Sequence, residues 1–230
     1  GKSRNLMMLA AYLTIVKKEK FLLLSNEMAE NDMRNCLITT VINNPEFQEL
    51  HGIKIKKREK EIVLGIYKDR KGEYITRLEN EKGEVIESTE EYLARIQEES
   101  AEYHKIIKIA NWLEKQTEGK LFFKDIGSDY SNETIEFECK KHKMLYGVNY
   151  VGYDTLKGYR SEDWATIKQT ATIFKELVKE LNMFGFCPFQ LTDDTVFTDV
   201  FQLSSNNIGG AKGMKHVADI LTLGKRINGD

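Results

Sequence analysis

Short apolar runs alternate with amphipathic stretches along this chain of 230 residues. Phe21–Ser25 and Leu121–Phe123 are compact, mostly apolar runs bounded by polar residues, a pattern typical of strands buried on both faces. Further strands are expected over Met144–Tyr153, Phe184–Phe189 and Val217–Leu223. All of these runs are too short to be independent helices, so we interpret them as the strands of one sheet.

Helical periodicity fills the spaces between the runs. Near the start, one stripe of apolar residues at helical spacing consists of Leu6, Leu9, Ala10, Leu13 and Val16. Further helices are predicted over Ala29–Val41, ending near Asn43-Asn44-Pro45, after a cap at Ser131, and over Trp164–Leu181. Strands that alternate with helices predict an α/β fold with a mostly parallel sheet between helical layers, and such a sheet binds its ligand at the carboxyl ends of the strands.

The segment over residues 52–119 has a different texture. Tyr74–Glu79 and Glu84–Glu87, separated by Asn80–Gly83, predict a hairpin, and Ser88 with Glu91 forms a capping box for a long helix. The residues expected on the buried side of that helix are Tyr92, Ile96, Tyr103, Ile107, Ala110 and Leu113. We interpret this segment as an insertion, with a hairpin and a long helix, into a single domain over residues 1–230.

Composition narrows the setting more than the function. The net charge of −2 favours neither nucleic acid nor any other partner, because a local basic patch can exist within a neutral total. Three scattered cysteines fit a reducing interior, and the four histidines show no metal-ligand spacing. No run approaches the roughly 20 apolar residues of a membrane span. We therefore expect a cytoplasmic protein that does not insert into a membrane.

The first three residues, Gly1-Lys2-Ser3, match the end of a phosphate-binding loop. In such a loop the lysine reaches the β- and γ-phosphates, the serine hydroxyl binds Mg²⁺, and the next helix points its N-terminus at the anion. A match of three residues also fits a cloning remnant or chance. Because the motif is cut in half and no initiator Met is present, we expect the chain to be a fragment that begins inside the loop.

Polar residues follow three of the expected strands. Glu27 comes directly after Phe21–Ser25, where a carboxylate could orient the water that attacks a γ-phosphate, although an acid at a helix N-terminus is the alternative. Asp154 ends the strand that includes Tyr153, as an acid that steadies Mg²⁺ would, although turns also favour Asp. Gln190 follows Phe184–Phe189, where its amide could contact a terminal phosphate. The order and spacing of these residues are more informative than any one of them.

This order resembles the RecA-type motor core, and more narrowly the DnaB-type replicative hexameric helicases, in phage or prophage versions. The residues that carry the resemblance are Leu24-Ser25-Asn26-Glu27-Met28 with Arg34, Tyr153-Asp154-Thr155-Leu156, Phe174-Lys175-Glu176-Leu177, Gln190-Leu191, Gly209-Gly210-Ala211-Lys212-Gly213 and Ala218-Asp219-Ile220-Leu221. They lie outside the segment over 52–119. The resemblance implies a RecA-like P-loop NTPase core that uses ATP and Mg²⁺.

The resemblance also implies roles at matching positions. Gly1, Lys2 and Ser3 would bind the phosphates, Ser3 and Asp154 the Mg²⁺, and Gln190 would sense the γ-phosphate. Glu27 would be the catalytic carboxylate. Arg34 matches an arginine of the family without a fixed role. The chain departs from the family pattern at Asn26, where a leucine is usual, and the arginine that reaches a neighbouring subunit is expected beyond Asp230.

Single-stranded DNA is expected at the polar, glycine-rich loop Thr192–His216. Lys212 and Lys215 of this loop, with backbone N–H groups and hydroxyls, suit a grip on phosphates that is independent of sequence, and a solvated connector is the alternative. The basic run Lys54–Lys60 is interpreted as a solvated face, because Glu59 and Glu61 dilute its charge.

The sequence therefore predicts the ATPase domain of a DNA helicase used in replication, with ATP bound at the subunit interfaces of a homo-oligomer, a hexameric ring in the full-length protein. Two alternatives remain open. One is a non-hydrolysing loader or scaffold that keeps the RecA fold, and the other is a recombinase-like ATPase that forms filaments. The presence of Glu27, Asp154 and Gln190 together favours an ATPase over a scaffold.

Overall fold

The computed structural model describes residues 2–55, 67–68, 74–75, 82, 84, 91, 94, 101–158, 164–189, 217–220 and 222. The chain divides into two compact units. The first is formed by Gly1–Met33 together with Gly119–Asp230, and the second by Arg34–Glu118. No helix of the described ranges is both long and apolar enough to cross a bilayer.

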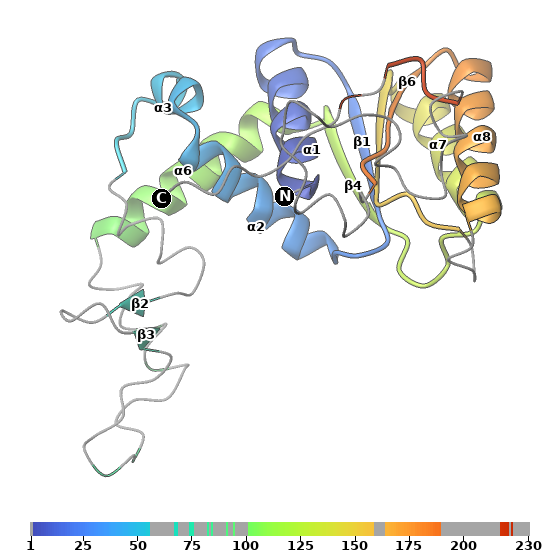
Figure 1. The fold of residues 1–230 in the computed structure, drawn as a ribbon. Coiled ribbons are helices and arrows are strands. Elements are labelled where there is room, and N and C mark those ends of the chain that lie inside the picture. Colours follow the sequence, from blue (N-terminus) through green and yellow to red (C-terminus); the bar gives the residue numbers. More distant parts are fainter. Residues whose placement is uncertain are drawn as a thin grey trace. The chain divides into compact units, whose positions relative to one another are not determined.

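A parallel sheet forms the centre of the first unit (Figure 1). Its strands are β1 (Phe21–Ser25), β4 (Leu121–Asp125), β5 (Tyr150–Asp154) and β6 (Phe184–Phe186). Within the described part of the chain they are ordered β4-β1-β5-β6, and every neighbouring pair is parallel. The prediction of an α/β fold with a mostly parallel sheet is confirmed.

The register places the ends of three strands side by side. Ser25, the last residue of β1, is aligned with Asp125 of β4 on one side and with Asp154 of β5 on the other. The five residues of β1 are all buried, as expected for a central parallel strand. Because the strands are parallel, the segments that leave β1 and β5 emerge at the same edge of the sheet.

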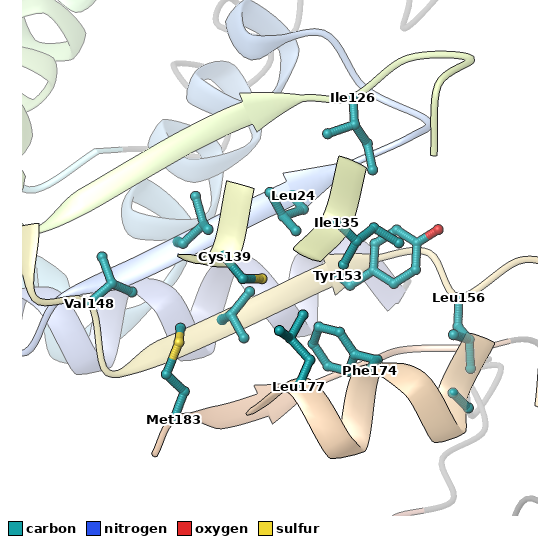
Figure 2. Packing of buried hydrophobic residues seen from close by; sticks show 13 residues of the cluster. Leu24, Ile126, Ile135, Cys139, Val148, Tyr153, Leu156, Phe174, Leu177 and Met183 are labelled. Atoms are coloured by element: carbon teal, nitrogen blue, oxygen red, sulfur yellow. The ribbon is translucent and has the colours of Figure 1, made fainter. Parts of the chain in front are cut away.

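Helices cover both faces of this sheet. Helix α1 (Lys2–Ala11) lies against the face on which Gly152 is located, where Leu6 occupies the space that a side chain at residue 152 would need. The other face packs against α7 (Asn132–Tyr146) and α8 (Trp164–Glu180). Figure 2 shows this core, whose buried members are Leu22, Leu24, Ile126, Ile135, Cys139, Val148, Val151, Tyr153, Leu156, Ala171, Phe174, Leu177 and Met183.

The first helix departs from the predicted stripe at its end. A π-helical segment, η1 (Tyr12–Val16), follows α1. The wider turn rotates the last residues relative to an ideal α-helix, so Ile15 is 3% exposed and Val16 is 43% exposed. The expectation that Val16 continues the apolar stripe is therefore wrong.

Three predicted strands are shorter than expected or absent. Met144 and Tyr146 belong to α7, which ends at Gly147 with φ 67°, so β5 begins only at Tyr150. Strand β6 stops at Phe186, and the described residues 217–220 and 222 form turns and irregular structure rather than a strand. In that last segment only Val217 packs against the core, while Asp219 binds Lys175 of α8 at 2.6 Å.

The second unit is mainly helical. It includes most of α2 (Glu30–Asn43), then α3 (Pro45–His51) and α6 (Ala101–Thr117). Asn44 caps α3 by accepting a hydrogen bond from the N–H of Glu46 at 2.8 Å. The helix over Ala29–Val41 and its end near Asn43-Asn44-Pro45 are thus confirmed to within two residues.

The central segment differs from its prediction in two details. Strand β3 (Tyr74–Ile75) pairs antiparallel with β2 (Tyr67–Lys68), whereas the sequence predicted a partner over 84–87, of which 85–87 lie outside the described residues. On α6 the buried residues are Ile106, Ile109 and Leu113, while Ile107 is 37% exposed. The predicted face was rotated by about one position, and Tyr92 and Ile96 lie outside the described residues. The insertion over 52–119 stays a prediction.

Two glycines of the sheet allow a test of the packing. A Cβ atom at Gly185 would lie 2.7 Å from Cε1 of Phe174, whose ring cannot yield without moving in the core. A Cβ at Gly152 would lie 2.9 Å from a methyl carbon of Leu6, which can rotate. We expect Gly185→Ala to lower the free energy of unfolding by about 1–3 kcal/mol, the usual range for overpacking, and Gly152→Ala to lower it less.

Urea unfolding of the two variants measures this difference. Gly152→Ala is the matched control, because both glycines lie in strands of the same sheet and gain the same methyl group. Equal losses in the two variants would show that the rigidity of Phe174 does not limit packing at this position.

Candidate functional site

Two polar residues begin α1 at the carboxyl edge of the sheet. Lys2 and Ser3 are the first two residues of the helix, and both are half-buried. Backbone N–H groups in the first turn of a helix have no partner within the helix, and the helix dipole is positive at this end. This end of α1 therefore has the charge and the free donors that a phosphate group requires.

The segment after β1 is held in a tight turn. The hydroxyl of Ser25, which is fully buried, accepts hydrogen bonds from the N–H groups of Glu27 at 3.2 Å and Met28 at 2.9 Å. Such a turn satisfies the backbone where the strand stops, before α2 begins at Glu30. It places Glu27 directly beyond the end of β1, with its side chain 37% exposed.

Asp154 ends β5 and is fully buried. Neither of its carboxylate oxygens has a hydrogen-bonding partner of ordinary geometry in the part of the chain that the structure describes. The peptide bond that follows, between Asp154 and Thr155, is cis. A buried carboxylate without hydrogen bonds is unusual, because desolvation of a charged group is costly unless the charge is compensated.

Electrostatics connect this carboxylate with the other candidates. Burial raises the pKa of Asp154 above its ordinary value, and the negative charge of Glu27 acts in the same direction. The hydroxyl of Ser3 and the ammonium group of Lys2 oppose this shift, although the contact with Ser3 falls short of an ordinary hydrogen bond. The side chains of Lys2, Ser3, Glu27 and Asp154 thus act on one another at one place.

A lysine from the other strand end pairs with Glu27. The Nζ atom of Lys157 lies 2.8 Å from Oε1 of Glu27, and the lysine side chain is 39% exposed. The hydrogen bond with Lys157 lowers the pKa of Glu27 below its ordinary value, and the charges of Lys157 and Lys2 add to this effect against partial burial. Glu27 is therefore kept ionised.

Asn26 joins the same two segments. Its backbone N–H donates to the carbonyl of Asp154 at 3.0 Å, and its side chain exchanges two hydrogen bonds with the backbone of Thr155, each 3.0 Å long. The Nδ2 group also donates to the hydroxyl of Tyr153 at 3.0 Å. The segment after β1 and the segment after β5 are consequently bound to each other by side chains as well as by the sheet.

The predicted site residues have different outcomes. Lys2, Ser3, Glu27 and Asp154 come together at the carboxyl edge of the sheet, at the place where a parallel sheet was expected to bind its ligand. Gly1, Gln190, Lys212 and Lys215 lie outside the described residues. The functional role of each of these eight residues stays a prediction.

Sequence reasoning missed Lys157 and Asn26 as parts of the site. Lys157 is three residues beyond Asp154, and a charged residue so soon after a buried strand was a signal that could have identified it. Asn26 was noticed only as a departure from a usual leucine. Its partners are 127 and 129 positions away in the chain, so nothing in its local sequence indicates them.

The donor set at Asp154 fits a magnesium ion. Mg²⁺ prefers oxygen ligands, keeps several waters, and is usually bound by one or two protein groups together with substrate phosphates. Asp154 and Ser3 offer oxygen atoms, and both oxygens of Asp154 lack partners among the described residues. These residues contain no cluster of three or more His, Cys, Asp or Glu side chains that could hold a metal ion without other ligands.

Comparison with known proteins shows the fold. No protein-family profile and no curated protein sequence matches the chain. Among solved structures, an isolated ATPase domain is similar with a TM-score of 0.62 and 15% identity, over 95% of this chain and 63% of that one. A DnaB-like replicative helicase, described with its interactions with primase, is similar with a TM-score of 0.61 and 15% identity, over 95% of this chain and 42% of that one.

The chain thus has the fold of DnaB-like helicase ATPase domains, and the RecA-like core implied by the sequence is confirmed. It spans less than two thirds of the length of either structure. Identity of 15% shows the fold alone.

The ion pair of Glu27 can be tested without reference to any activity. Replacing Lys157 by Met removes the main cause of the lowered pKa of Glu27 and leaves the opposing effect of burial. We expect the pKa of Glu27 to rise in Lys157→Met, so that the carboxylate takes up its proton at a higher pH than in the unchanged chain. Carboxyl ¹³C NMR measured across a pH titration follows this group.

Lys140→Met is the matched control, because Lys140 pairs with Glu136 and Glu180 and has no recorded contact with Glu27. It should leave the pKa of Glu27 unchanged. An unchanged value in Lys157→Met would show that the ion pair does not persist in solution.

Proposed function

We propose that this chain is the ATPase domain of a DNA helicase, which binds ATP with Mg²⁺ at the edge of its sheet and hydrolyses it to drive movement along single-stranded DNA. The observation that carries this proposal is the meeting of Lys2 and Ser3, from the start of α1, with Glu27 and Asp154, from the ends of two adjacent parallel strands. A lysine, a hydroxyl and two carboxylates in this arrangement suit phosphoryl transfer.

The start of α1 would hold the phosphates. Lys2 contributes a positive charge, and the backbone N–H groups of the first helical turn point toward an anion placed at this end. Ser3 and Asp154 would hold Mg²⁺, with Asp154 acting through the bound waters. A bound Mg²⁺ neutralises part of the phosphate charge that develops during transfer. Its positive charge would also compensate the buried, unpaired carboxylate of Asp154.

Glu27 is proposed to act on the attacking water. Its side chain is partly exposed, so water can reach it, and its pairing with Lys157 keeps it ionised. An ionised carboxylate can orient a water molecule and accept its proton. The hydrogen bonds from Glu27 and Met28 to Ser25 fix the backbone that carries this carboxylate, which limits the orientations it must explore.

The remaining roles rest on the resemblance of the sequence. Gln190 would sense the γ-phosphate, and Lys212 and Lys215 would contact the phosphates of single-stranded DNA. Two lysines give one subunit a weak hold, so tight binding would require several copies in a ring, as the multivalency of an oligomer provides. The matched DnaB-like structure is a replicative helicase, which is consistent with this proposal.

The catalytic assignment predicts a specific loss. In the full-length protein, Glu27→Gln should keep ATP binding and lower turnover by about 10²–10⁴-fold, the usual contribution of a positioned proton acceptor. Lys2→Ala should abolish ATP binding or hydrolysis. Steady-state ATPase assays and equilibrium binding of a fluorescent ATP analogue separate the two effects.

Glu46→Gln is the control for the loss of one carboxylate, because Glu46 is an exposed residue at the start of α3. It should leave turnover unchanged. Normal ATPase activity in Glu27→Gln would refute the catalytic assignment and favour a scaffold that has kept the RecA fold.

The DNA assignment predicts a change in salt dependence. In the assembled full-length protein with ATP present, Lys212→Ala combined with Lys215→Ala should weaken binding to single-stranded DNA of any sequence. It should also flatten the dependence on salt, since each phosphate contact contributes about 0.7 to the slope. Fluorescence anisotropy at several salt concentrations measures both, and basal ATP hydrolysis should persist. Binding as tight as that of the unchanged protein would exclude this loop as the DNA site.

A further inference from the structure

Asn26 occupies the point at which the pairing of β1 with β5 stops. The two strands are aligned up to Ser25 and Asp154, and the N–H of Asn26 makes one more backbone bond, to the carbonyl of Asp154. Beyond this point the backbones would separate, because Glu27 and Met28 turn back toward the hydroxyl of Ser25.

The side chain of Asn26 continues the pairing across this gap. Its Oδ1 atom accepts the N–H of Thr155, and its Nδ2 group donates to the carbonyl of the same residue, both at 3.0 Å. A carboxamide has one donor side and one acceptor side, as a peptide group has. The exchange of two hydrogen bonds with one residue is the arrangement of a hydrogen-bonded pair in an antiparallel ladder. The side chain thus substitutes for a peptide group.

A third hydrogen bond anchors this pairing in the core. The second hydrogen of Nδ2 is directed to the hydroxyl of Tyr153, whose ring is fully buried and lies among the core residues shown in Figure 2. All the hydrogen-bond donors of the carboxamide are consequently used. A side chain held by three bonds, one of them to a buried ring, has little freedom to rotate.

The two carboxylates of the proposed site lie directly beside this pairing. Glu27 follows Asn26, and Asp154 precedes Thr155, so a shift of one strand end against the other would move the two acids relative to each other. Lys157, two residues beyond Thr155, reaches Glu27 across the same junction. We propose that Asn26 is a positioning residue, which sets the place of Glu27 relative to Asp154 through the backbone of Thr155.

This inference rests on the proposed function, because the separation of the two acids matters only if they act on one bound phosphate group. Asn26 touches neither the phosphate nor the water in this scheme. Its effect is on geometry, and geometry of this kind affects the rate of the chemical step more than the binding of the nucleotide.

The test replaces Asn26 by Leu, which has a similar volume and no hydrogen-bonding group. In the full-length protein, kcat for ATP should fall about 10- to 100-fold, as for a displacement of about 1 Å at a reacting group, while KM stays within about threefold. A readout independent of turnover is the exchange of the Thr155 amide hydrogen, which should become about tenfold faster when its hydrogen bond to Oδ1 is lost.

Ser131→Ala is the control for general loss of stability. Ser131 caps α7 by accepting the N–H of Thr134, and its removal should lower the stability while leaving both the exchange of Thr155 and kcat unchanged. If the leucine variant does not fold, Asn26→Ala provides the same comparison, because the smaller side chain admits water to the backbone of Thr155.

Unchanged exchange of Thr155 in the Asn26 variants overturns the inference. Faster exchange with unchanged kcat also overturns it, since the pairing would then exist without a role in positioning. Faster exchange with a fall in kcat at constant KM supports it. A failure of the proposed function is distinguishable, because the unchanged protein would then hydrolyse no more ATP than Glu27→Gln does, and both proposals would fall together.

Discussion

The parallel alignment of β1 with β5 is the constraint on which the candidate site depends. It brings the residues after Ser25 and the residues around Asp154 to one edge of the sheet, although more than half of the chain separates them. Hydrogen bonds of the ladder fix the direction and register of both strands, and the buried side chains on both faces prevent a slip of one residue, which would turn every side chain to the opposite face. The polar contacts of Asn26 and Lys157 refine an arrangement that the sheet has already set.

The sequence predicted the elements whose pattern is determined locally. Phe21–Ser25 was identified because a central parallel strand is apolar on both faces, and the structure shows it fully buried. The cap at Ser131 was found because a side chain that bonds an N–H three residues later is a local interaction. The positions of Glu27 and Asp154 followed from one topological rule, that parallel strands present their carboxyl ends together.

What the sequence could not predict depended on distant partners or on small changes in helix geometry. Met144 and Tyr146 are exposed apolar residues of α7, so their apolar character wrongly indicated a strand. Val16 was expected on a buried stripe because the π-helical turn of η1 leaves no mark in the pattern of residues. Asn26 and Lys157 gain their meaning only from Thr155 and Glu27, which no local spacing connects to them.

Gly152 gives the site a property that its polar groups alone would not provide. Because residue 152 has no side chain, Leu6 can approach the strand closely, and α1 rests directly on β5 two residues before Asp154. The height of the helix above the strand is set there, by contacts between carbon atoms. Lys2 and Asp154 are thus mounted on two bodies that touch at a point about one turn of helix from the first and two residues from the second. The precision of the polar site is inherited from an apolar joint beneath it, and that joint is insensitive to both pH and salt.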